Sequence, residues 1–142
     1  MKVSELMTKN VIGISPEESA EVAARMLTHY NIGALPVCGA DGKLCGMVTD
    51  RDLVIRCMAS GKMPSQTKVR TLMTGKIVSV SPDADAANAA HLMGSRQIRR
   101  LPVVENGKVC GMISLGDIAR QEENQGIAAQ ALNGVTSGVQ KE

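Results

Sequence analysis

Hydrophobic and polar positions follow the same succession of periods twice along the chain. Short β-branched runs over residues 11–14 and 77–80 each end at a Ser-Pro pair, which predicts a strand followed by a turn or a helix entry. Behind each run, apolar residues recur every three or four positions, as expected for one face of a helix. The positions are Ala23, Met26, Leu27 and Tyr30 in the first half and Ala86, Ala89, Ala90 and Met93 in the second.

A hairpin and a further helix are predicted after each of these helices. Residues 101–104 and 109–113 form a strand pair around Asn106-Gly107, a signal of a type I′ turn, and Asp41-Gly42 has the same place in the first half. A last helix in the first half is expected from Thr49 or Asp50 toward Ala59, with Gly61 as its stop. The earlier helix begins either at Ser15-Pro16, as a capping box, or nearer Ser19.

These elements are two copies of one internal repeat. Residues 3–8 return as residues 69–74 at an offset of 66, which falls to 65 after the hairpin loop. Each copy has only about 60 residues, which leaves apolar surface uncovered, so we expect an α/β fold of two pseudo-twofold-related units packed through their small sheets. Such packing forms two equivalent clefts suited to small ligands. The expected division is a first domain at 3–59, a linker at 60–68, a second domain at 69–121, and a C-terminal helix or flexible tail at 122–142.

Composition and charge narrow the function classes. The chain of 142 residues is 44% hydrophobic and 21% charged, as in an ordinary folded protein, and its formal net charge is +2. It has no Trp or Phe and a single Tyr, so it offers no aromatic platform for nucleic-acid bases. Glu5 interrupts the N-terminus where a secretory signal needs an apolar run, and no run has the length of a membrane span. We therefore expect a cytoplasmic protein that binds neither membrane nor nucleic acid.

The same short motif ends the hairpin in both copies. Thr49 is followed three residues later by Asp52, and Ser114 by Asp117. At a strand-to-helix turn, the first amides of the helix suit a phosphate, and a carboxylate one turn further can accept both hydroxyls of a ribose. The same spacing also describes a plain helix cap. Taken alone, the motif favours the helix cap, and the nucleotide interpretation stays open beside it.

The chain resembles the cystathionine beta-synthase (CBS) domain family in its tandem arrangement, the Bateman module. The resemblance covers residues 3 to about 120 in two copies. It rests on Leu-Met-Thr at 6–8 and 72–74, Leu-Pro-Val at 35–37 and 101–103, the Ala-rich helices after Ser-Pro, and the Gly-x-x-Thr/Ser-x-x-Asp segments at 46–52 and 111–117. The family implies β-α-β-β-α units that bind AMP, ADP or ATP, less often S-adenosylmethionine, and that regulate another protein.

The resemblance also implies a role for matching positions. Thr49 and Ser114 would contact phosphate, and Asp52 and Asp117 would hold the ribose. The adenine would lie against the first strand and the start of the hairpin. These positions are Ile12, Gly13, Ile14, Gly33, Ala34 and Leu35 in one site and Val78, Ser79, Val80, Arg99, Arg100 and Leu101 in the other.

The two expected sites differ in charge. Where the first copy has Gly33-Ala34, the second has Arg99-Arg100, whose guanidinium groups can bind phosphate. We therefore expect tighter and more phosphate-dependent binding beside Ser114 and Asp117. A solvated basic turn is the alternative interpretation of these arginines.

The resulting hypothesis is an adenine-nucleotide-binding regulatory module without cofactor or catalytic residues. We expect it to act in trans on a partner protein, since no effector domain accompanies it, and to form a homodimer by the habit of the family. One alternative is an interaction or structural module with empty clefts. Another is a thiol or metal-binding stress protein, for which Cys38, Cys45 and Cys110 are weak metal-ligand candidates. Small buried thiols on a strand are the favoured explanation of these cysteines.

Overall fold

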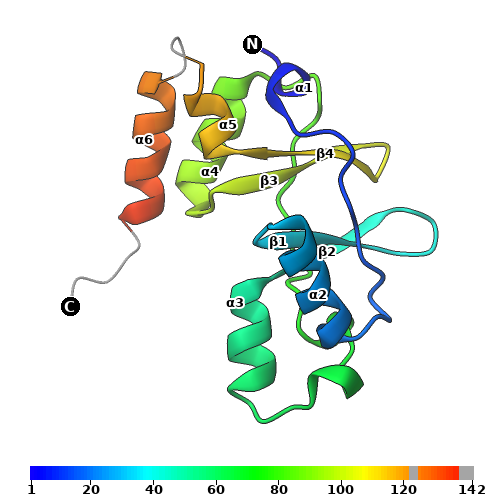
Figure 1. The fold of residues 1–142 in the computed structure, drawn as a ribbon. Helices are drawn as coiled ribbons and strands as arrows, with labels where there is room; N and C mark the ends of the chain where they lie inside the picture. Colours follow the sequence, from blue (N-terminus) through cyan, green and yellow to red (C-terminus); the bar gives the residue numbers. More distant parts are fainter. Residues whose placement is uncertain (122–124, 138–142) are drawn as a thin grey trace. The chain divides into compact units, whose positions relative to one another are not determined.

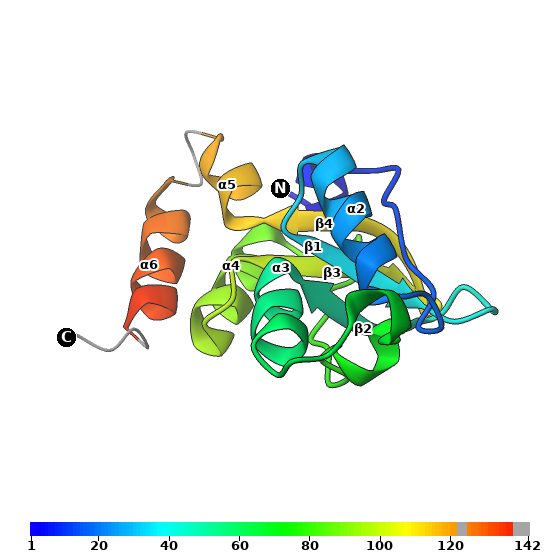
Figure 2. The ribbon, with the colours of Figure 1, turned by 60° about the horizontal axis from the view of Figure 1, so that its bottom comes forward.

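The computed structural model describes residues 1–121 and 125–137 and divides into two compact units (Figures 1 and 2). Unit 2 comprises Ile12–Ile77, and unit 1 comprises Met1–Val11 together with Val78–Glu142. Each unit has a two-stranded antiparallel sheet with helices, so the predicted mixed α/β class is confirmed.

Unit 2 is built around the hairpin of β1 (Ala34–Cys38) and β2 (Leu44–Thr49), whose register pairs Ala34 with Thr49. Helix α2 (Ala20–Tyr30) precedes the hairpin. After it, α3 (Asp50–Asp52) continues as the π-helical η1 (Leu53–Met58), followed by the 3₁₀ turns η2 (Pro64–Gln66) and η3 (Val69–Thr71). Gly61 has a φ of 73°, which fits the predicted stop of this helix.

Unit 1 repeats this plan and adds one helix. The short α1 (Val3–Leu6) joins α4 (Ala86–Arg96), the hairpin of β3 (Arg100–Glu105) and β4 (Lys108–Ser114), and α5 (Leu115–Ala119). At the turn, Asn106 and Gly107 have φ values of 54° and 80°, as a type I′ turn requires. The additional helix α6 (Gln125–Thr136) packs against α4 and α5 (Figure 1).

The two cores are made of equivalent, mostly small aliphatic residues. Ala23, Leu35 and Val37 are buried in unit 2, and their repeat mates Ala89, Leu101 and Val103 are buried in unit 1. The chain has no Trp or Phe, and alanines make up most of the buried face of α4. All four residues predicted for the buried face of α4 are 0% exposed, namely Ala86, Ala89, Ala90 and Met93.

The structure corrects two local predictions and decides between the two predicted starts of the first helix. The runs at 11–14 and 77–80 are not strands, because only Ile14 and Val80 pair with the hairpins, each through a single parallel bridge. Tyr30 is 44% exposed rather than buried, because the helix ends there, at an Asn31 cap in the left-handed conformation. The start of α2 lies at Ser19, whose side chain accepts a hydrogen bond from the Val22 amide at 3.2 Å.

Each unit is completed by the Leu-Met-Thr segment of the other sequence repeat. In unit 1, the Val3 amide donates to the Ala84 carbonyl at 2.8 Å, and Thr8 pairs with Met112. In unit 2, the Val69 amide donates to the Glu18 carbonyl at 2.8 Å. The compact units therefore differ from the sequence repeats: residues 1–11 fold with the second repeat, and the first residues of the second repeat, up to residue 77, fold with the first repeat.

Candidate functional site

In both units the candidate site is the junction where the second hairpin strand meets a helix. In unit 1, the Ser114 hydroxyl accepts from the Asp117 amide at 3.0 Å, and an Asp117 carboxylate oxygen accepts from the Ser114 amide at 2.8 Å. In unit 2, Thr49 and Asp52 make the same two bonds at 3.1 and 2.9 Å. The helix-cap interpretation of the motif is thus realised in both copies. A carboxylate oxygen that accepts one hydrogen bond can accept a second, so the helix cap does not exhaust the capacity of the aspartate to accept a hydrogen bond from a ligand hydroxyl.

The start of the hairpin lies directly beside each junction. The Leu115 amide donates to the Arg99 carbonyl at 2.8 Å, and Arg100 pairs with Ser114 across the sheet. Hence the structure places Arg99, Arg100, Ser114 and Asp117 at the same junction. The equivalent set in unit 2 is Gly33, Ala34, Thr49 and Asp52, tied by the Asp50 amide donating to the Gly33 carbonyl at 3.1 Å.

The predicted adenine-facing segments run along the outer edge of each hairpin. The Ile14 amide donates to the Pro36 carbonyl at 3.0 Å, and the Val80 amide donates to the Pro102 carbonyl at 3.1 Å. Ile12 and Val78 are half-buried and Gly13 and Ser79 are exposed, whereas Ile14 is only 4% exposed. Leu35 and Leu101 are 0% exposed, so their side chains belong to the cores. In this part of the site, a ligand has access to the flanking residues rather than to these leucines.

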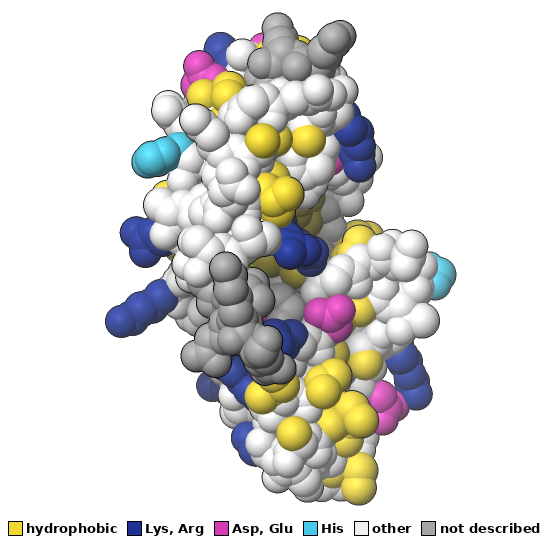
Figure 3. All heavy atoms as spheres, turned by 90° about the vertical axis from the view of Figure 1, so that its left-hand side faces the viewer, with side chains coloured by type: hydrophobic (Ala, Val, Ile, Leu, Met, Phe, Trp, Pro, Cys, Tyr) yellow, Lys and Arg dark blue, Asp and Glu magenta, His cyan; other side chains and the backbone are white. Residues whose placement is uncertain are grey.

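A groove of about 570 Å³ opens at the junction of unit 1. Of the residues predicted for this site, Arg99, Arg100 and Ser114 line it. The remaining lining residues are Leu115, Gly116 and Ala119 of α5 and Gln125, Ala128, Ala129 and Leu132 at α6. Figure 3 faces the side on which α6 lies and shows basic side chains beside apolar ones. The α6 residues were missed by sequence reasoning, because α6 has no counterpart in the repeat that could have marked it.

The charges at the two junctions differ. In unit 1, Arg99 and Arg100 are exposed, and neither forms an ion pair with any residue that the structure describes. In unit 2, the repeat mates of Leu115 and Gly116 are Asp50 and Arg51. Asp50 is an exposed carboxylate at the first turn of α3, where it repels an anion.

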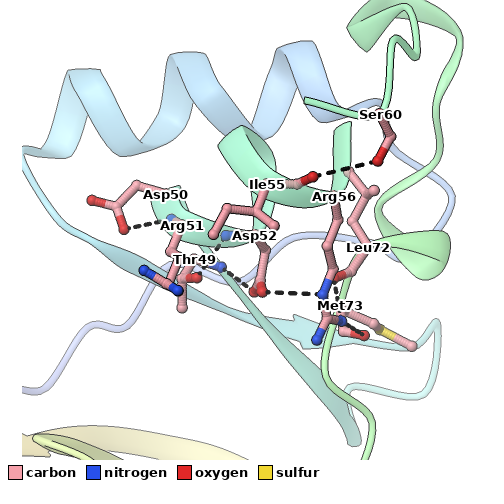
Figure 4. A network of polar contacts seen from close by, with 9 residues as sticks. All are labelled: Thr49, Asp50, Arg51, Asp52, Ile55, Arg56, Ser60, Leu72 and Met73. Atoms are coloured by element: carbon pink, nitrogen blue, oxygen red, sulfur yellow. Dashed lines mark hydrogen bonds and ion pairs between the residues drawn. The ribbon is translucent and has the colours of Figure 1, made fainter. Parts of the chain in front are cut away.

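Asp52 has a second contact that ties the junction of unit 2 to the first residues of the second sequence repeat (Figure 4). The Arg56 guanidinium lies 3.7 Å from the Asp52 carboxylate and donates to the Leu72 carbonyl at 3.1 Å. In unit 1, Arg120 donates to the second carboxylate oxygen of Asp117 at 2.9 Å. Both aspartates therefore hold a partner arginine as well as the helix cap.

The cysteines form no metal centre among residues 1–121 and 125–137, where no three His, Cys, Asp or Glu side chains gather at ligand distance. Burial, and secondarily the neighbouring Cys45, raises the pKa of the Cys38 thiol. Burial also raises the pKa of Cys110, with Glu105 as a smaller cause. Without a bound metal, the Cys38 and Cys110 thiols are therefore held in the protonated form more strongly than an exposed cysteine.

Comparison with known proteins identifies related sequences over nearly the whole chain. The model of the family described as CBS domain matches residues 3–58 and 69–124. The CBS domain-containing protein YhcV of Bacillus subtilis is 37% identical over 134 residues, which cover 94% of this chain and 94% of the relative. No helix in the described part of the chain has both the length and the apolar character of a membrane span.

Two solved structures share the fold at high similarity. Hypoxic Response Protein I, crystallised with two coordinated zinc ions, has a TM-score of 0.79 and 33% identity, covering 85% of this chain and 98% of that one. A CBS domain pair in complex with 5-methylthioadenosine and S-adenosyl-L-methionine has a TM-score of 0.78 and 26% identity, covering 88% and 98%.

Proposed function

The chain belongs to the CBS-domain family, and from this premise we propose that it is a regulatory module that binds an adenine nucleotide and transmits the occupancy of its site to a partner protein. The observation that carries the proposal is the groove of unit 1, where Ser114 and two arginines without ion-pair partners among the described residues share one wall. A related domain pair holding adenosyl compounds supports the ligand class. The function is binding, with no catalytic step.

In the proposed complex, each part of the nucleotide has a chemically matched partner in unit 1. The guanidinium groups of Arg99 and Arg100 and the Ser114 hydroxyl bind the phosphate. The Asp117 carboxylate, beside the groove but not in its lining, accepts from the ribose hydroxyls. The adenine lies against the apolar side of the groove, which residues 78–80 do not line. AMP, ADP and ATP are the ligands that this charge distribution favours over S-adenosylmethionine, which has no phosphate.

The site of unit 2 is proposed to bind more weakly. Thr49 and Asp52 keep the geometry of the cap, but Gly33 and Ala34 offer no cation for a phosphate. At the first turn of the helix the negative charge of Asp50 is balanced by the exposed Arg51, so this junction lacks the excess of positive charge that Arg99 and Arg100 give to unit 1. A ligand without phosphate, held by Asp52 and the residues near Gly13, is the one that this site can accept at least electrostatic cost.

We also propose that the protein functions as a homodimer. Val54, Ile55 and Met58 of η1 are 53%, 45% and 66% exposed, and Met63 nearby in the chain is 62% exposed. Four large apolar side chains exposed within ten positions of the chain favour contact with a second protein surface.

The test compares a nucleotide with its nucleoside by calorimetry and thermal unfolding. AMP at 100 times its dissociation constant is expected to add about 2.7 kcal/mol, or roughly 5 to 11 °C in the unfolding midpoint. Replacing both Arg99 and Arg100 with Gln should weaken AMP and leave adenosine binding unchanged, since only the phosphate contacts are removed. Absence of a shift with millimolar AMP, ADP, ATP and S-adenosylmethionine would overturn the proposed function and favour an interaction module with empty clefts.

A further inference from the structure

Helix α6 is the one helix in the described part of unit 1 that lies outside the sequence repeat. Its Ala128, Ala131 and Val135 are 5%, 4% and 8% exposed, so one face is fully packed. Ala129 and Leu132 belong to the same helix but remain exposed, Leu132 to 44%. These two residues line the groove at Arg99, Arg100 and Ser114.

Two glycines let α6 approach α4 at backbone distance. A Cβ atom at Gly134 would lie 2.6 Å from the Gly94 carbonyl oxygen, and one at Gly94 would lie 3.1 Å from the Cα of Ala131. The repeat mate of Gly94 in α2 is Thr28. A side chain of that size cannot occupy the α4 position while α6 is docked, so this contact is specific to unit 1.

The groove has two chemically different walls. One wall offers the Ser114 hydroxyl and two guanidinium groups, and the other offers the apolar side chains of α5 and α6. An anion alone needs only the first wall. The combination suits a ligand with an anionic group on an organic body, which is the chemistry of a nucleoside phosphate.

We infer that α6 is part of the ligand site of unit 1, with Ala128, Ala129 and Leu132 forming the apolar wall against which a bound nucleoside phosphate rests. The inference rests on the proposed function and deepens it, because it names the element that senses the ligand. A ligand in contact with both walls binds better when α6 is docked than when it is not. By linkage, ligand binding strengthens the docking of α6 on α4, and loosening of that docking weakens the ligand.

The inference is tested with two glycine substitutions in the same helix. Gly134→Ala places a methyl group against the Gly94 backbone, whereas Gly126→Ala adds the same group where nothing lies within 4 Å. Both changes raise helix propensity equally, so only the docking differs. Leu132→Gln changes the wall itself at an exposed position and therefore leaves folding intact.

The measurements are AMP affinity by calorimetry and amide hydrogen exchange of residues 125–136. Gly126→Ala should bind AMP like the wild type, whereas Gly134→Ala and Leu132→Gln should bind at least about fivefold more weakly. AMP should slow exchange in α6 of the wild type. If the wild type binds AMP but both variants bind equally well and α6 exchange is unchanged, the inference is overturned while the proposed function stands. If the wild type binds no AMP, the proposed function itself fails.

Discussion

Asp117 is the residue at which a helix cap and a ribose contact can be separated by substitution. One carboxylate oxygen accepts from the Ser114 amide at 2.8 Å, and the other accepts from the Arg120 guanidinium at 2.9 Å. The Asp117 side chain is 11% exposed, whereas that of Arg120 is 76% exposed. Asp117→Ala removes both bonds. Asp117→Asn keeps a side-chain oxygen for the Ser114 amide but removes the negative charge.

The expected loss of stability follows from these contacts. The charge-assisted bond at the cap is worth about 1 to 2 kcal/mol. The exposed ion pair with Arg120 adds about 0.5 kcal/mol or less. Asp117→Ala should therefore lower the free energy of unfolding by roughly 1 to 2.5 kcal/mol, a fall of about 2 to 10 °C in the midpoint. Asp117→Asn should lose less than half of that, because its amide oxygen preserves the cap.

AMP affinity should order Asp117→Ala and Asp117→Asn differently from their stability. A carboxylate accepts from both ribose hydroxyls, whereas an Asn side chain has one oxygen and presents donors beside it. AMP affinity, measured by calorimetry, should fall about tenfold or more in both variants, although only Asp117→Ala is strongly destabilised. Wild-type AMP affinity in Asp117→Asn would refute the ribose contact. An unchanged unfolding midpoint in Asp117→Ala would refute the cap.

Three further outcomes follow from the structure. Gly111→Ala should lower the free energy of unfolding, measured in urea, by about 1 to 3 kcal/mol, because its Cβ would lie 2.5 Å from the Met7 sulfur and 3.0 Å from the Thr8 carbonyl oxygen. The control Gly75→Ala should leave that free energy unchanged, since nothing lies within 4 Å of its Cβ. The Cys38 thiol should react with iodoacetamide more slowly than free cysteine at pH 8, because its raised pKa keeps it protonated. Its rate should still rise with pH where the rate of free cysteine has levelled off. Equal rates in peptide-resolved mass spectrometry would contradict this prediction. Met58→Glu should shift the protein from dimer to monomer in sedimentation, and a monomeric wild type would refute the proposed homodimer.

The sequence predicted best those elements whose signal is local and repeated. The alanine face of α4 and the Asn106-Gly107 turn are both confirmed, since periodicity and turn chemistry act over a few residues. The strand predicted at 11–14 failed because β-branched composition marks an extended segment but not a partner with which it can form a ladder. Only Ile14 finds one, through the Pro36 and Cys38 backbone.

The sequence predicted only one side of the groove, because the other side is formed in part by α6, which lies outside the repeat. Arg99, Arg100 and Ser114, which line the groove, were expected in one site from the family resemblance, and comparison of the two repeats drew attention to the arginines. The α6 wall has no such reference, and its glycines read equally well as turn signals. What reveals their role is the distance from Gly134 to Gly94, a contact between residues forty positions apart that no local pattern encodes.

The two halves differ in the exposed residues that surround the ligand junction and α6. Buried mates remain alike, as Leu35 with Leu101 and Val48 with Ile113. The exposed mates around the junction change in kind, since neutral Gly33 and Ala34 correspond to arginines, and Asp50 corresponds to Leu115. Packing alone would tolerate the same exposed residues in both halves, because exposed substitutions cost little. The α4 glycine that admits α6 occurs only in the half that has the arginines, which is the distribution expected if α6 and the arginines contact the same ligand.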